Sequence, residues 1–175
     1  MITGKVKRQD LFIVTKLPIF ALNPSAVRPT VEQSLKNLCI DYLDLYLIHS
    51  PMGIEFDFKK MAPIKNDNGQ HILNVENDHI GIWRELEKLV DEGKIRSIGV
   101  SNFSSPQVAN IMKQCRIPVA VNQVECSLFF QQKKLRDNLE KMGVKLMAYG
   151  SLGSSGTNSL QLHVNQIVIE LMFSF

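Results

Sequence analysis

The feature that most constrains this 175-residue chain is a regular alternation of short apolar runs with helical patterns. The apolar runs have the length of strands and are apolar almost throughout, which is typical of strands in a parallel sheet covered on both faces. A helical pattern separates each run from the next. The sequence therefore predicts the order β-α-β-α-β-α-β-α-β, right-handed crossovers and one parallel α/β sheet. The expected strands are residues 11–15, 43–48, 98–100, 119–124 and 144–149.

The helical patterns place apolar residues three and four positions apart, so that each expected helix has one apolar face. In the first helix, Pro29 predicts that the regular helix begins only near that residue. In the third, we expect Ser105 as the N-cap and Pro106 at the first helical position. Gly93 and Gly143 are expected to end the second and fourth helices in the left-handed conformation. The four patterns cover residues 27–38, 80–90, 105–115 and 135–142.

A long insertion, residues 50–77, follows the second expected strand. Its Asp67–Asn68–Gly69 sequence is typical of a tight turn and predicts a small hairpin. Loops of this length inside a compact domain are usually lids or binding loops. The length of the chain favours a single domain over residues 1–175.

A polar or ring-bearing residue stands at or near the end of each expected strand. In a parallel α/β protein these ends meet at one rim, where ligands bind. Any one of these residues could simply be a polar residue at a strand end. Their occurrence at five strand ends in succession favours a ligand-binding site. No GxGxxG, Walker, HExxH or GxSxG motif is present, which argues against a Rossmann dinucleotide site. The candidate residues are Lys16, His49, Ser101, Asn102, Gln123 and Tyr149.

Composition narrows the possible partners and surroundings. The net charge of +3, from 20 basic and 17 acidic residues, is too small to indicate nucleic acid. No apolar run is long enough for a membrane span, and the N-terminus has no signal-peptide core. The three cysteines show no CxxC spacing, so we expect neither a disulfide framework nor a metal site. We therefore expect a reducing, cytoplasmic location.

Five segments together resemble the aldo-keto reductases. They occur in the family's order and spacing, and the match around them runs from about residue 4 to residue 154, which is most of the chain. Each motif alone is moderately specific, and the five in order are strongly so. They are Val14–Pro18, Leu43–Pro51, Gly99–Phe103, Val121–Glu125 and Ala148–Ser154.

The resemblance implies a TIM (β/α)8 barrel that binds NADP(H) and reduces a small aldehyde or ketone. Lys16 and His49 match two members of the family's catalytic tetrad. In the family the lysine lowers the pKa of a tyrosine that protonates the carbonyl oxygen, and the histidine orients that carbonyl. The cofactor provides the hydride, so the protein contributes positioning and acid catalysis.

The same resemblance assigns the remaining rim residues to the cofactor. The side chains that match partners of the nicotinamide carboxamide are Ser101, Asn102 and Gln123, and Tyr149 matches the ring that stacks on the nicotinamide. Leu152 and Ser154 match contacts of the pyrophosphate. The insertion 50–77 matches the loop that shapes substrate preference. The oligomeric state stays open.

Two departures from the family pattern predict that the chain is truncated at both ends. Residues 1–15 contain no match to the catalytic Asp and Tyr, and residues 157–175 resemble no family element. A complete barrel needs roughly 250 residues, so we expect a partial barrel of about five β/α units. The full-length form would reduce carbonyls, while this chain would be inactive alone. The alternative is a non-catalytic product that binds nucleotide weakly or associates with a full-length homologue.

Overall fold

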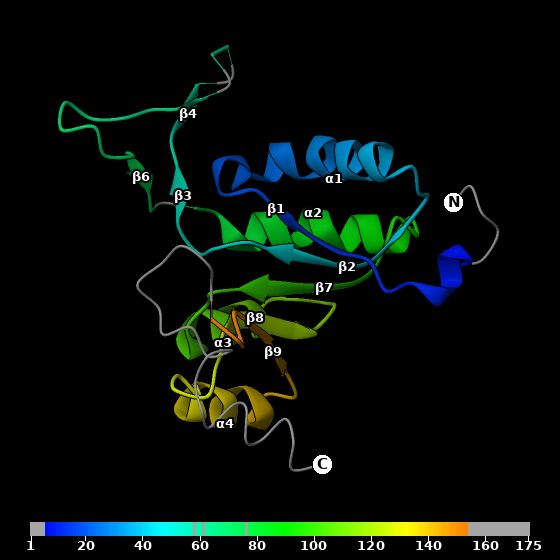
Figure 1. Ribbon diagram of the computed structural model, residues 1–175. Coiled ribbons are helices and arrows are strands. Elements are labelled where there is room, and N and C mark those ends of the chain that lie inside the picture. The colour runs from blue at the N-terminus through cyan, green and yellow to red at the C-terminus, as the bar shows by residue number, and fades with distance from the viewer. Residues whose placement is uncertain (1–5, 58, 61, 76, 154–175) are drawn as a thin grey trace.

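The computed structural model describes residues 6–57, 59–60, 62–75 and 77–153. Within these residues one parallel sheet has the strand order β1-β2-β7-β8-β9, with an α-helix between each strand of this sheet and the next (Figure 1). This confirms the expected α/β order, and the barrel is not closed over the described part of the chain. The strands are β1 (Val14–Leu17), β2 (Leu43–Ile48), β7 (Ile95–Ser101), β8 (Val121–Glu125) and β9 (Lys145–Tyr149).

The helices cover one face of this sheet and form a single hydrophobic core with it. Trp83 of the second helix is 1% exposed, and Tyr46 of β2 is fully buried against the same core. Gly93 and Gly143 adopt positive φ angles of 72° and 73° beyond the helix ends, as the sequence predicts. Two short 3-10 helices, Arg8–Asp10 and Ile19–Ala21, flank β1. The helices are α1 (Pro24–Leu38), α2 (His79–Asp91), α3 (Ser105–Met112) and α4 (Lys133–Lys141).

On the opposite face of the sheet, the close packing of three strands depends on a glycine, Gly99. Leu47 of β2 is the register partner of Gly99 in β7, and Leu47 is fully buried. A Cβ atom at Gly99 would lie 2.9 Å from a methyl carbon of Leu47 and 2.7 Å from the carbonyl oxygen of Val121. Because these distances are too short for a side chain, glycine is what lets β2, β7 and β8 approach one another on this face.

The insertion projects from the sheet beyond the end of β2 (Figure 1). It contains two short antiparallel pairs, and between them Gly69 turns the chain with a φ of 76°. Ile72 donates its backbone N–H to the carbonyl of Ile64, which closes the hairpin that the Asp-Asn-Gly sequence predicts. The pairs are β3 (Gly53–Ile54) with β6 (Leu73–Asn74), and β4 (Phe56–Asp57) with β5 (Ala62–Pro63).

The expectation that α1 begins only near Pro29 is wrong. The helix begins at Pro24, and Pro29 lies inside it. Asn23 caps the first turn by accepting the backbone N–H of Ser25 at 3.0 Å, and Val27, before the proline, is fully buried. This cap and the buried valine offset the one backbone hydrogen bond that Pro29 removes.

Several other boundaries differ from the prediction, including the start of β7, which lies at Ile95 rather than at residue 98. Strand β1 begins at Val14, where its pairing with β2 starts, while Leu11 and Phe12 are exposed outside the sheet. Helix α3 has Ser104, rather than Ser105, as its N-cap, because the backbone N–H of Ser104 donates to the side chain of Gln107 at 2.9 Å. An N-cap three residues before Gln107 completes the reciprocal capping pattern.

Helix α2 also fixes the turn that leads into β8. The carboxylate of Glu87 is buried and accepts the backbone N–H groups of Arg116 at 2.6 Å and Ile117 at 2.8 Å. The indole of Trp83 donates to the carbonyl of Ile117 at 3.0 Å. These contacts place the start of the strand that carries Gln123.

We predict that Glu87→Ala lowers the free energy of unfolding by about 2–4 kcal/mol, because two backbone N–H groups lose their acceptor. The matched variant Glu87→Gln retains an acceptor oxygen and should lose less. Urea unfolding followed by the fluorescence of Trp83, the single tryptophan, measures both. Equal losses in the two variants would show that the charge, and not the hydrogen bonds, carries the effect.

Candidate active site

The six rim residues that the sequence singles out surround one cavity. It has a volume of about 330 Å³ and lies at the ends of the five strands. No acidic side chain is among its described lining residues. The structure thus brings together residues up to 133 positions apart in the chain, from residue 16 to residue 149. The lining residues are Lys16, His49, Ser101, Asn102, Gln123 and Tyr149.

The register of the parallel strands explains this convergence. Lys16, next to last in β1, pairs with Leu47 of β2, and His49 directly follows β2. Ser101 ends β7 and pairs with Gln123 of β8. Because register partners in neighbouring strands point to the same face, side chains from successive strands meet at the rim.

Asn102 forms hydrogen bonds with several residues of the rim and has an unusual backbone conformation. Its φ is 63°, in the left-handed region, where Asn is better tolerated than most residues. Its backbone N–H donates to the carbonyl of Gln123 at 2.9 Å, and its amide nitrogen donates to the carbonyl of His49 at 3.0 Å. The hydroxyl of Tyr149 donates to its amide oxygen at 3.0 Å. One side chain thereby links the ends of β2, β7 and β9.

His49 and Lys16 share the basic side of the cavity. Although the imidazole is exposed, nearby protein removes part of its hydration, and this desolvation lowers the pKa of His49; the positive charge of Lys16 lowers it further. Both effects favour the neutral form of the imidazole. Among the described residues no carboxylate forms an ion pair with Lys16.

Sequence reasoning missed one residue of this region, Met147. It is the register partner of Gln123, and its sulfur accepts the side-chain N–H of Gln123 at 2.8 Å. Met147 and Tyr149 are two positions apart in β9, so both side chains point to the same face. That spacing was the signal available in the sequence.

The expected pyrophosphate contacts are not part of the cavity wall. Leu152 is 58% exposed and does not line the cavity. Ser154 and the tail 157–175 lie outside the described residues.

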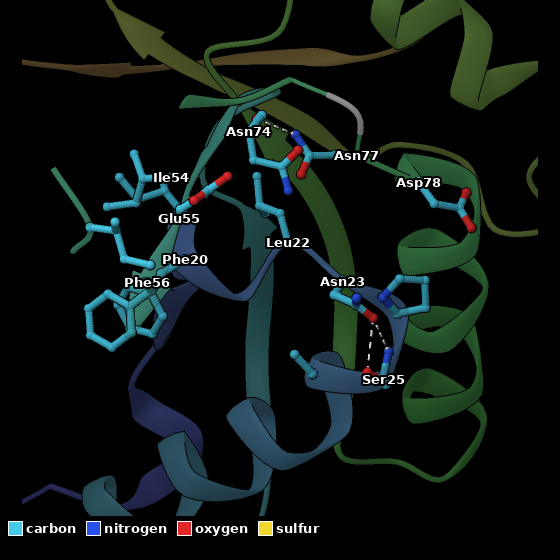
Figure 2. Close-up of a pocket in the computed structure, with 14 residues that line it drawn as sticks. Phe20, Leu22, Asn23, Ser25, Ile54, Glu55, Phe56, Asn74, Asn77 and Asp78 are labelled. Carbon is cyan, nitrogen blue, oxygen red and sulfur yellow. Dashed lines mark hydrogen bonds between the residues drawn. The ribbon is translucent and has the colours of Figure 1, made fainter. Parts of the chain in front are cut away.

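A larger cavity of about 540 Å³ lies between the start of α1 and the insertion (Figure 2). Phe20 and Phe56 stack at one side of it with ring centroids 4.4 Å apart, and Glu55 and Asp78 contribute carboxylates. No Lys, Arg or His is among its described lining residues. The six rim residues are absent from this wall, so the basic and amide groups of the candidate chemistry belong to the smaller cavity.

Residues 6–57, 59–60, 62–75 and 77–153 contain no group of three or more His, Cys, Asp or Glu side chains arranged to hold a metal ion. No helix in the same part of the chain is long and apolar enough to cross a membrane.

The architecture and site define a parallel β/α protein of the TIM-barrel type with a polar cavity at the strand ends. A model of the aldo/keto reductase family matches residues 1–163. Aldo-keto reductase family 4 member C11 from Arabidopsis thaliana is 39% identical over 170 residues, which are 97% of this chain and 51% of that protein. Dihydrodiol dehydrogenase 3 from Bos taurus is 41% identical over 153 residues, 86% of this chain and 46% of that protein.

Solved structures agree with this assignment. The aldose reductase from Schistosoma japonicum has a TM-score of 0.77 and 41% identity, covering 82% of this chain and 47% of that one. The aldose reductase from Giardia lamblia has a TM-score of 0.84 and 28% identity, covering 93% and 52%. The chain belongs to the aldo/keto reductase family. It spans about half the length of the curated relatives it matches.

We predict that Asn102→Ala lowers the free energy of unfolding by about 1–3 kcal/mol, since it removes the side-chain links and strains a left-handed backbone. Asn102→Gly also removes the links but accepts the backbone conformation, and should recover about 1 kcal/mol. Urea unfolding compares the two variants. A neutral Asn102→Ala would show that the network does not stabilise the rim.

The pKa of His49 should lie below its ordinary value and should rise in Lys16→Met, because one repulsive charge is removed. It should stay below 6.5, since desolvation, the larger cause, remains. A pH titration of the histidine ring signals by NMR, with His49→Gln for assignment, measures this. As the pH falls, His49 takes up a proton more readily in the unfolded chain than in the folded one. The free energy of unfolding should therefore decrease as the pH drops below about 6.5. An unchanged pKa in Lys16→Met, or the same rise in the control Lys113→Met, would contradict this coupling.

Proposed function

We propose that this chain carries the nicotinamide-binding and carbonyl-orienting part of a reductase that uses NADP(H) to convert a small aldehyde or ketone to an alcohol. The observation that carries the proposal is the single cavity lined by Lys16, His49, Ser101, Asn102, Gln123 and Tyr149. Membership of the aldo/keto reductase family supports it.

The cavity's polar groups fit the amide end of a nicotinamide. Its wall contains the amides of Asn102 and Gln123 and the hydroxyl of Ser101, which are the kinds of group that form hydrogen bonds with a carboxamide. The ring of Tyr149 is 40% exposed, so one aromatic surface is accessible for stacking. We assign the cofactor's carboxamide to Ser101, Asn102 and Gln123 and its ring to Tyr149, with Leu152 and Ser154 proposed near the pyrophosphate.

When bound, the reduced nicotinamide supplies a hydride. The task of His49 is to hold the substrate carbonyl. Its lowered pKa favours the neutral imidazole, which has one ring N–H to donate to the carbonyl oxygen. The fixed charge of Lys16, in the same cavity, favours the negative charge that develops on that oxygen.

The proton for the alcohol requires a further group. Tyr149 is the only phenol among the described lining residues, and its hydroxyl proton is donated to Asn102. We therefore place the proton donor outside the described residues, where it would use Lys16 as its cationic neighbour. The insertion 50–77 begins directly after His49 and is proposed to shape the choice of carbonyl substrate.

The test is equilibrium binding of NADPH to the 175-residue chain by calorimetry. We predict that the chain binds NADPH and that Gln123→Ala weakens binding roughly 10-fold, the effect of losing one or two hydrogen bonds. The matched control Gln70→Ala changes a glutamine in the hairpin turn of the insertion and should leave the affinity unchanged.

A chain that does not bind NADPH, or that binds it equally well without Gln123, would overturn the proposed function. Oxidation of NADPH with a generic aldehyde is measured in parallel, and we expect no turnover by this chain alone. Family-like turnover would instead show that this chain itself contains the proton donor. Co-purification with a full-length reductase would favour a non-catalytic, associating role.

A further inference from the structure

We propose that Met147 is a positioning residue: its thioether holds the side-chain amide of Gln123 by the nitrogen, which leaves the amide oxygen to accept an N–H from the carboxamide of a bound nicotinamide. The inference rests on the proposed function and adds a residue to it. It depends on the contact between the sulfur of Met147 and the amide nitrogen of Gln123, 2.8 Å apart.

The backbone of Gln123 is already fixed by its neighbours. Its carbonyl accepts the hydroxyl of Ser101 at 2.8 Å and the backbone N–H of Asn102 at 2.9 Å. Its side chain is held differently: among the described residues, its one hydrogen bond is to Met147. The orientation of this amide therefore depends on the thioether.

The two ends of a glutamine amide have opposite hydrogen-bonding character. The nitrogen donates and the oxygen accepts, so rotating the amide by half a turn exchanges the group offered to a ligand. A thioether sulfur can only accept, and it therefore selects the orientation in which the nitrogen faces Met147. The oxygen is then the end available to the N–H group of a carboxamide.

The placement of Met147 suits this role. Met147 and Gln123 are register partners in adjacent parallel strands, so their side chains share a face and lie side by side. Both are half-buried, and Gln123 lines the cavity. Methionine is unbranched and adaptable, so its sulfur can follow the amide without disturbing the strand.

The chain provides a matched control in Met112. Its sulfur accepts the backbone N–H of Val119 at 3.3 Å, between α3 and the segment before β8. Met112 does not line the candidate cavity. Replacing Met112 by Leu removes a sulfur acceptor of the same kind, and any effect that is only structural should appear there as well.

The experiment measures binding of two nucleotides to the full chain by calorimetry. One is NADP+, and the other is its 3-acetylpyridine analogue, in which a methyl group replaces the carboxamide NH2. We expect Met147→Leu to weaken NADP+ binding about 2- to 10-fold, the value of one neutral hydrogen bond, and to leave the analogue unchanged. Met147→Gln, whose side-chain oxygen can accept the same N–H, should restore binding, and Met112→Leu should not alter it.

Equal weakening of both nucleotides by Met147→Leu would overturn the inference, because the effect would not involve the carboxamide. Unchanged NADP+ binding in Met147→Leu would overturn it while leaving the proposed function intact. Absence of binding by the unaltered chain would overturn both. The side-chain amide signals of Gln123 in a 1H–15N spectrum give a readout independent of the cofactor, and they should shift in Met147→Leu but not in Met112→Leu.

Discussion

The arrangement of the site depends on the hydrogen bonds of Asn102. A parallel sheet brings its strand ends to one rim, but it does not by itself hold the residues that follow those strands. Asn102 does so with one backbone and two side-chain contacts, to Gln123, His49 and Tyr149. The left-handed backbone at Asn102 directs the amide along the rim, toward both β2 and β9. The histidine and the aromatic ring are thus positioned by the same side chain.

Below the cavity, neighbouring strands of the same sheet approach one another closely because Gly99 has no side chain. Leu47 and Val121 occupy the space beside Gly99, and no other residue type fits there without displacing backbone atoms. Farther out, Glu87 and Trp83 hold the turn before β8. The cavity therefore lies on strands that are fixed from both faces of the sheet, which is the support that a site for a precisely oriented reaction needs.

Much of this arrangement could be predicted from the sequence, because strand order and polar strand ends are local signals. All six rim residues were found in this way. The errors occurred where long-range packing decided the outcome. Pro29 lies inside a helix because Val27 is buried before it, and Leu11 and Phe12 are apolar yet lie outside the sheet pairing. Met147 was missed because a thioether in a strand looks like an ordinary core residue until its partner across the sheet is known.

We propose that the rim cavity, and not the larger cavity beside the insertion, receives the nicotinamide. The most direct measurement is a 1H–13C NMR spectrum of the chain with labelled methionine methyl groups, of which there are seven, during addition of nicotinamide mononucleotide. We predict that the signal of Met147 shifts in a saturable way while those of Met112 and of Met52, at the base of the insertion, stay in place. A shift of Met52 without Met147, or no shift at all, would contradict the assignment of the site.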